Sequence, residues 1–337
     1  GRWQIVGKRN GLPGDSVSSV YLDREGSVWL GMNGRGLARW IGYGEWEGFS
    51  DAEGLGNETV WQVVAGAGGV VWVGTGDGVY RATDRGGAYS FQKAPEFPSG
   101  PIIAMLAARD GAIWAAPQSG HLYRRDPRSG QVREYFIPSL EPGAFVMRLS
   151  EGPDGSIYAA ISQHASLAVV SPGGRVTDLP LPAGQTVRGL AVTAAADGTV
   201  WFGAETGLYR YAGGRWTRFG RRDGLMDDSV HGISLGPDGE IWIVYNIPAG
   251  LTRGIPDGGR MRFQHVTMAD GLPSQLLYFA KFDAKGHLWA GTDRGVAVFD
   301  GKNWIQYRRG DGLIWDDCNT DAFAAEPDGA VWIGTSG

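Results

Sequence analysis

The sequence has almost no cysteine, no excess of positive charge and no long apolar segment. Its one cysteine, Cys318, excludes an internal disulfide framework and a structural zinc site built on cysteines. The formal net charge of −5 gives no electrostatic reason to expect binding to nucleic acid or to an anionic membrane. No apolar run approaches the roughly 18 residues of a membrane-spanning helix, and Gly1 to Trp3 do not resemble a signal peptide. We therefore expect neither nucleic-acid binding nor membrane contact from this segment.

Glycine and tryptophan are abundant instead. The 337 residues include 56 glycines and 14 tryptophans, while the hydrophobic fraction is an ordinary 42%. Glycine supplies tight turns, and aromatic residues favour strands. The composition therefore indicates many short, aromatic-rich strands joined by tight turns.

An internal repeat accounts for this composition. A turn that ends in glycine and is followed three residues later by an aromatic residue occurs eight times, at intervals of 41 to 47 residues. The aromatic residues are Trp29, Trp72, Trp114, Tyr158, Trp201, Trp242, Trp289 and Trp332. Eight units of about 43 residues thus fill the chain, and a period of this length is typical of solenoids and propellers.

Each unit contains four strand-like segments. In the first unit these are residues 17–22, 28–31 and 37–40, followed by a segment that carries Trp46 and Phe49. Period-2 alternation bounded by Gly, Asp and Asn is the hairpin pattern. Four-stranded antiparallel units at this period predict an all-β fold, a β-propeller. Most of its strand aromatics should pack between neighbouring blades.

The number of units favours eight blades, with seven as the alternative. Residues 1–6 resemble the last strand of a unit, whereas the chain stops after a second strand. Docking of residues 1–6 on the last blade would close the ring and hide two sheet edges. We therefore predict a single propeller domain over residues 1–337.

Residues that break the repeat are the candidates for a binding site. Positions that only pack should stay apolar around the ring, but one pair of neighbouring positions in the first strand of each unit does not. There the sequence has Trp61, Arg148, His231, Tyr278 and Asp321. They are candidates for ligand binding at the mouth of the central channel, and filling of an irregular channel is the alternative.

Two further groups of residues extend this candidate site. Trp61 and Trp315 are the two tryptophans outside the repeated strand positions, and planar aromatic rings on a wet face can stack on sugars or flat ligands. Packing of the linkers is the alternative for both. The turns between second and third strands add polar groups suited to hydroxyl-rich ligands, namely Asn33, Arg35, His164 and Asn246.

The repeat resembles a known family. The segment DGLPSQ…FDAKGHLWAGTDRGVAVFDGKNWIQY, residues 270–307, is similar to the two-component regulator propeller repeat, and the similarity extends over essentially the whole chain. It is weak in units 3 and 4, where the Asp-Gly-Leu linker is absent. The resemblance implies a periplasmic or extracytoplasmic sensor region of a bacterial signalling protein. It also implies a glycan or other small molecule as ligand, and a second propeller or Y-rich domain as partner in the full-length protein.

Catalytic and metal-binding motifs are not found in the sequence. The five histidines show no metal-ligand spacing, and no nucleophile elbow, zinc-protease motif or phosphate loop occurs. We expect no cofactor, no metal and no enzymatic activity, although the paired aspartates 227–228 and 316–317 could hold a cation. One alternative is a lyase resembling streptogramin lyase, with His231, His164, Asp321 and Glu205 as candidate residues. The other is a scaffold that binds proteins.

Overall fold

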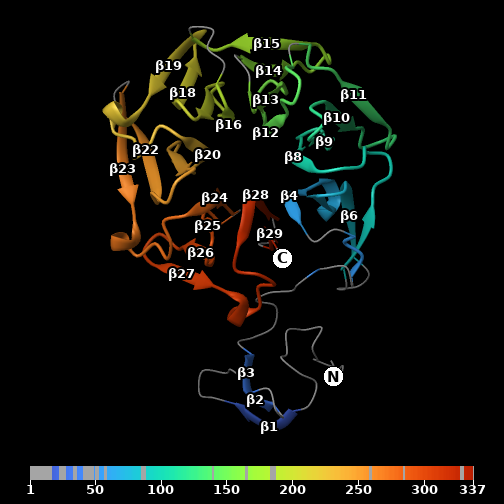
Figure 1. Cartoon of the computed structure of the whole chain (residues 1–337), viewed down its shortest axis with the longest axis vertical. Helices are drawn as coiled ribbons and strands as arrows, with labels where there is room; N and C mark the ends of the chain where they lie inside the picture. Colours follow the sequence, from blue (N-terminus) through green and yellow to red (C-terminus); the bar gives the residue numbers. More distant parts are fainter. Residues whose placement is uncertain are drawn as a thin grey trace.

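The computed structural model describes residues 17–22, 28–32, 36–40, 49, 53–56, 59–84, 89–138, 140–163, 166–182, 187–257, 260–283, 285–326 and 330–336. Over these residues the chain is built of β-strands with a few single 3-10 turns. Most strands are arranged in a ring around a central axis, with chain order followed around the ring (Figure 1). Within this part of the chain, no helix is long and apolar enough to cross a membrane.

Six four-stranded antiparallel blades make up most of the ring. In each blade the strands pair in chain order, and the first strand lies innermost (Figure 1). The blades are β4–β7 (Val60–Ala65, Val71–Thr75, Val79–Asp84, Tyr89–Lys93), β8–β11 (Ile102–Ala107, Ile113–Pro117, Leu122–Arg125, Val132–Tyr135), β12–β15 (Val146–Glu151, Ile157–Ile161, Ser166–Val170, Val176–Pro180), β16–β19 (Gly189–Ala194, Val200–Ala204, Gly207–Ala212, Arg215–Phe219), β20–β23 (Val230–Leu235, Ile241–Tyr245, Leu251–Asp257, Arg260–Val266) and β24–β27 (Leu277–Phe282, Leu288–Thr292, Gly295–Phe299, Trp304–Tyr307).

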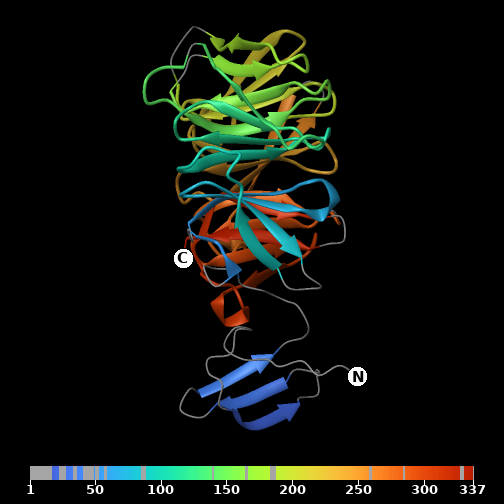
Figure 2. The ribbon, with the colours of Figure 1, turned by 90° about the vertical axis from the view of Figure 1, so that its right-hand side faces the viewer.

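Two smaller sheets come from the ends of the sequence. The strands β28 (Cys318–Ala325) and β29 (Val331–Thr335) form a two-stranded sheet, and β28 contacts both β24 and β4. The strands β1 (Val17–Leu22), β2 (Val28–Met32) and β3 (Gly36–Trp40) form a three-stranded sheet that lies outside the ring (Figures 1 and 2).

The predicted blade number is therefore wrong, while the all-β propeller of four-stranded blades is confirmed. The described residues form six four-stranded blades, neither eight nor seven. The number of repeats in the sequence does not equal the number of blades in the ring. Because β28 packs directly on β4, the strands of the first unit find no place between them. Residues 1–6, predicted to close the ring, lie outside the described residues, and the single domain over 1–337 stays a prediction.

The Asp-Gly pairs of the repeat form the turns between first and second strands. Asp197 Oδ1 accepts a hydrogen bond of 2.8 Å from the backbone N–H of Thr199, and Gly198 has a φ of +82°. Asp110 and Asp154 accept the same bond from the residue two positions later, at 2.9 and 3.0 Å. A short acidic side chain and a residue free to take positive φ are what such a turn requires.

The Asp-Gly-Leu linkers join one blade to the next. In the turn η6 (Met268–Asp270), Asp270 accepts a hydrogen bond of 2.9 Å from the backbone N–H of Thr267. Gly271 then takes a φ of +90°, which ends the turn. The following Leu272 is 2% exposed and packs in the core between the fifth and sixth blades. Each of the three linker residues therefore has its own structural task.

The repeated tryptophans of the second strands pack between sheets, as predicted. Trp201 is 5% exposed and Trp242 is 7% exposed. Each is covered by an arginine of the third strand, because the guanidinium carbons of Arg210 and Arg253 lie 5.7 and 5.6 Å from the respective ring centroids. Burial of a large aromatic surface and a cation–π contact thus stabilise the same position.

Replacement of Trp201 by alanine tests this packing. We expect Trp201→Ala to lower the free energy of unfolding by about 3–5 kcal/mol, since a large buried aromatic side chain is lost and a cavity is left. The matched control is Trp315→Ala, whose side chain is 43% exposed and should cost within about 1 kcal/mol. Urea denaturation of both variants measures the difference. Equal losses would contradict the assignment of Trp201 to the core.

Candidate functional site

A β-bulge in each innermost strand brings side chains to the central channel. In β4, Val60 pairs with Thr75 and Gln62 pairs with Gly74, so Trp61 is left unpaired. The same shift in the other five blades leaves one residue unpaired in each, namely Ile103, Met147, Leu190, His231 and Tyr278. A bulge redirects a side chain and increases local twist. Three residues that break the repeat in the sequence, Trp61, His231 and Tyr278, are therefore bulge residues of the fold, whereas Arg148 follows the bulge of β12 and pairs with Ala160.

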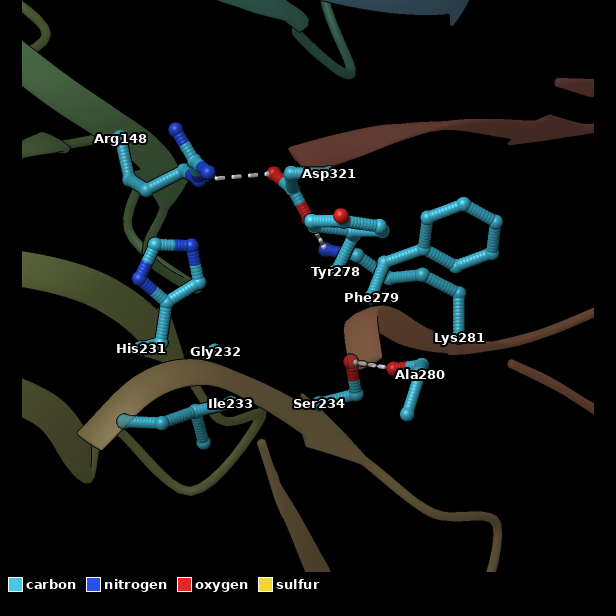
Figure 3. A pocket seen from close by; sticks show the side chains of 10 residues that line it. All are labelled: Arg148, His231, Gly232, Ile233, Ser234, Tyr278, Phe279, Ala280, Lys281 and Asp321. Atoms are coloured by element: carbon cyan, nitrogen blue, oxygen red, sulfur yellow. Dashed lines mark hydrogen bonds and ion pairs between the residues drawn. The ribbon is translucent and has the colours of Figure 1, made fainter. Parts of the chain in front are cut away.

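A hollow in the channel brings four of the predicted residues together. It is lined by Arg148 of β12, His231 of β20, Tyr278 and Lys281 of β24, and Asp321 of β28 (Figure 3). Its walls are completed by Gly232, Ile233, Ser234, Phe279 and Ala280. The hollow encloses about 210 Å³, including the part that is open to solvent. The part of it that is shielded from solvent has room for about one water-sized group.

Asp321 is the centre of the polar contacts in the hollow. Its Oδ1 lies 2.6 Å from Lys281 Nζ, and its Oδ2 lies 3.2 Å from Arg148 Nε. Gln62 Nε2 donates to both Oδ2 and the backbone oxygen of Asp321, each at 3.3 Å. Gln62, Arg148, Lys281 and Asp321, which we call the Asp321 cluster, therefore tie together four of the innermost strands.

The backbone of Asp321 is held in an unusual conformation. Its φ is +62°, and among the described residues it is the only non-glycine with a positive φ. It lies where the pairing of β28 with β29 is interrupted between Cys318 and Phe323. Aspartate tolerates this left-handed region better than most residues, yet the conformation still costs free energy. Strain kept at a site with charged partners suits a functional position.

The charges of the hollow are set by burial and by mutual contact. Burial alone would raise the pKa of Asp321, but Lys281 and Arg148 together with the Gln62 hydrogen bond lower it overall. Burial also lowers the pKa of Arg148, in part against the effect of Asp321. Burial and the nearby Arg148 lower the pKa of His231 to about 4. At neutral pH the hollow therefore contains two cations, one carboxylate and a neutral imidazole.

Tyr278 has a further contact at the edge of the hollow, and the other predicted residues lie at different places. Tyr278 hydrogen-bonds Asp317, and burial together with this bond raises its pKa. Trp315 is 43% exposed, with the Arg309 guanidinium carbon 4.8 Å from its ring centroid. Trp61 is half-buried, and its buried Nε1 has no hydrogen-bond partner among the described residues. Asn246 is exposed just after β21. Asn33, Arg35 and His164 lie outside the described residues.

Sequence reasoning did not select two members of the Asp321 cluster. Lys281 lies in β24 five residues before the turn glycine Gly286, where the other units carry tyrosine, valine, leucine, serine, threonine or alanine. A lysine at this position was a signal that could have been used. Gln62 stands beside the bulge residue Trp61, and its partner Asp321 is 259 residues away in the chain. Of the paired aspartates, none belongs to a group of three or more potential metal ligands within the described part of the chain.

Comparison with known proteins supports the repeat assignment. A family model described as "Two component regulator propeller" matches residues 11–34. The chain carries a two-component regulator propeller repeat. The family resemblance predicted from the sequence is thereby confirmed. A search of curated proteins found no match.

Solved structures with the same fold include sensor and enzyme propellers. The chain is similar to the extracellular domain of a protein assigned to the hybrid two component systems of B. thetaiotaomicron, with 18% identity and a TM-score of 0.76 over 96% of this chain and 44% of that one. It thus spans less than half of that structure. It is also similar to streptogramin B lyase, with 15% identity and a TM-score of 0.66 over 84% of this chain and 92% of that one. A third similar structure is a virginiamycin B lyase from Staphylococcus aureus with quinupristin. Its identity is 16% and its TM-score is 0.57, over 81% of this chain and 90% of that one. Identities this low establish the fold alone.

Replacement of Asp321 by asparagine tests the cluster. Asp321→Asn keeps the size of the side chain and its tolerance of positive φ, but it leaves Arg148 and Lys281 without their carboxylate. Loss of one partner from a buried pair costs about 3–5 kcal/mol, and we expect the lower end because Asp321 is 20% exposed. The control is Glu205→Gln, whose pair with Arg188 is 47% and 50% exposed and should contribute at most about 1 kcal/mol. Urea denaturation that finds the two losses equal would contradict a buried ionic cluster.

The pH dependence of stability tests the environment of His231. Its folded pKa of about 4 lies below the unfolded value near 6.5, so the unfolded chain binds more protons between these values. Stability should therefore fall as the pH is lowered through this range, by about 2 kcal/mol from pH 7 to pH 5 for this group. Asp321, whose pKa is lowered, stays charged over the same range. Between pH 7 and pH 5 we expect the free energy of unfolding of His231→Gln to fall by about 2 kcal/mol less than that of the parent chain. Urea titrations at the two pH values measure this difference. The same loss in both proteins would show that His231 is not buried in this way.

Proposed function

We propose that this chain is a ligand-sensing propeller, without enzymatic activity, in the extracytoplasmic sensor region of a bacterial two-component signalling protein. Its ligand is an oligosaccharide or another small molecule bound at the mouth of the channel. The observation that carries the proposal is the convergence of Arg148, His231, Tyr278 and Asp321 on one hollow. The two-component propeller repeat and the likeness to an extracellular domain of a hybrid two component system support the signalling context.

The position of the hollow suits signalling because it joins several blades. The Asp321 cluster draws one residue from each of four innermost strands, β4, β12, β24 and β28. A ligand can shift a protein between two states only by binding them with unequal affinity. A ligand that contacts these residues would change the packing of four strands at once, and a second propeller or a Y-rich domain of the full-length protein would receive that change.

A lyase is the second candidate, favoured by the similarity to two propeller lyases. Elimination needs a general base with a pKa near the working pH. His231, with a pKa of about 4, is a weak base at neutral pH. Of the other two described candidates, Glu205 is paired with Arg188 at 3.3 Å, and Asp321 is paired with Lys281 and Arg148. These environments suit recognition better than proton abstraction.

A thermal-shift screen with ligand analysis tests the proposal. The probes are soluble neutral and acidic oligosaccharides added to the full chain, and every ligand is analysed by mass spectrometry afterwards. We expect at least one probe to raise Tm while staying chemically unchanged, since a ligand at 100 times its Kd stabilises by about 2.7 kcal/mol. Consumption of that ligand would make the protein an enzyme. No shift with any probe would overturn the proposal in favour of a protein-binding scaffold.

The exposed Trp315 provides the matching variant. Trp315→Ala should weaken the ligand-induced shift while costing no more than about 1 kcal/mol of stability in the absence of ligand. The control is Ile305→Ala on the outermost strand β27, which is 47% exposed and should leave the ligand-induced shift unchanged. A weaker shift in both variants would place the ligand away from the channel mouth.

A further inference from the structure

The hollow is lined by two cationic side chains, Arg148 and Lys281, and by one carboxylate, that of Asp321. The Asp321 carboxylate is shared between Lys281 and Arg148, so one positive charge is left over. The next charged group towards His231 is Arg188, which is already paired with Glu205 and also lowers the pKa of His231. The acidic residues Asp317 and Asp293 lie on the Tyr278 side. The excess positive charge therefore lies on the side of Arg148 and His231.

Arg148 has more N–H donors than it has partners among the described residues. A guanidinium carries five N–H donors. Arg148 Nη1 donates to the backbone oxygen of Met147, and Nε faces Asp321 Oδ2 at 3.2 Å. Within the described part of the chain no partner is found for Nη2. The side chain is only 9% exposed, yet Nη2 is not among the described buried atoms that lack a partner, so this donor keeps some exposed surface and is available to a ligand.

His231 supplies a second unused polar group. Its Nδ1 is buried and has no hydrogen-bond partner among the described residues. In Figure 3 the imidazole of His231 lies next to the guanidinium of Arg148, on the side of the hollow opposite Phe279. A neutral imidazole can donate one N–H, and a carboxylate can accept from both residues at once.

We propose that the hollow binds the carboxylate of a small acidic ligand between Arg148 and His231. The inference deepens the proposed function and rests on it, because it names the chemical class of the ligand at the same site. The described residues leave the charges of the cluster out of balance and the His231 Nδ1 without a partner, and an unpaired buried charge destabilises a fold. An added carboxylate balances the charge and satisfies both groups.

The size of the hollow fits one acidic group better than a long chain. The shielded part has room for about one water-sized group, so one carboxylate oxygen can be seated there while the atoms that carry the carboxylate stay in the open part. The rest of the ligand would then lie towards the rim. Sugar acids and simple organic acids share this chemistry, and the experiment below separates them.

Matched acid and ester probes test the inference. Glucuronate, its methyl ester and acetate are each titrated into the full chain and followed by calorimetry. We expect glucuronate to bind at least about 10-fold more tightly than the ester, which has nearly the same shape without the charge. Binding by acetate with the same dependence on Arg148 would also support the inference and show that the sugar ring is dispensable. Equal affinities for acid and ester would overturn it and leave the proposed function standing.

Two variants make the test independent of folding. Arg148→Met should remove the preference for the acid over the ester, but it also breaks a buried ion pair and can impair folding. His231→Gln leaves the pair of Arg148 and Asp321 in place and should reduce the preference several-fold. In the parent chain the bound carboxylate should raise the pKa of His231, so glucuronate should bind more tightly at pH 5 than at pH 7, with proton uptake. An unchanged preference in His231→Gln, or no binding of any of the three probes, would overturn the inference whatever the oligosaccharide screen gives.

Discussion

Closure of the ring between β28 and β4 is the contact on which the other blades depend. The sheet edges of the blades in a propeller are protected only when the ring is complete. Here the two strands that meet come from residues 259 positions apart. Asn319 Nδ2 donates to the backbone oxygens of Val60 and Thr335, and Gln62 donates to Asp321. Apolar packing of Ala322 and its neighbours accompanies these bonds. Polar groups therefore fix which strand of the last unit meets the first blade.

This polar closure has a cost that apolar packing would not have. It places Asp321 at a positive φ and keeps Arg148 largely out of water. Replacement of such groups by apolar residues of similar volume often stabilises a protein. A chain that keeps them uses them for more than stability, and strained residues tend to be found at binding sites. In this protein closure and the candidate site share the same residues, so the ligand proposed for Arg148 would act directly on the contact that completes the ring.

The sequence predicted the elements of the blades better than their number. Gly198, Leu272 and Trp201 each have one local task, in a turn, in a linker and between two sheets, so their spacing in the chain reveals it. Blade number depends on which units enter the ring, and the packing of β28 on β4 is a contact between distant segments that no repeat length encodes. The same limit applies to the site. The bulge residues His231 and Tyr278 could be found because they break a repeated position, whereas the pairing of Gln62 with Asp321 follows only from closure.

The similarity to both sensors and lyases shows that the fold leaves the choice of function to a few side chains. In a propeller the innermost strands supply one or two residues each, so a change of chemistry needs substitutions at bulge positions and no change of scaffold. In this chain the bulge position of β20 carries an imidazole whose low pKa keeps it neutral, and the position after the bulge of β12 carries a cation partly neutralised by Asp321. Such a pair holds an anion well and removes a proton poorly, because the same burial that leaves donors unused also weakens the base. The arrangement therefore favours recognition over turnover on physical grounds that are independent of family resemblance.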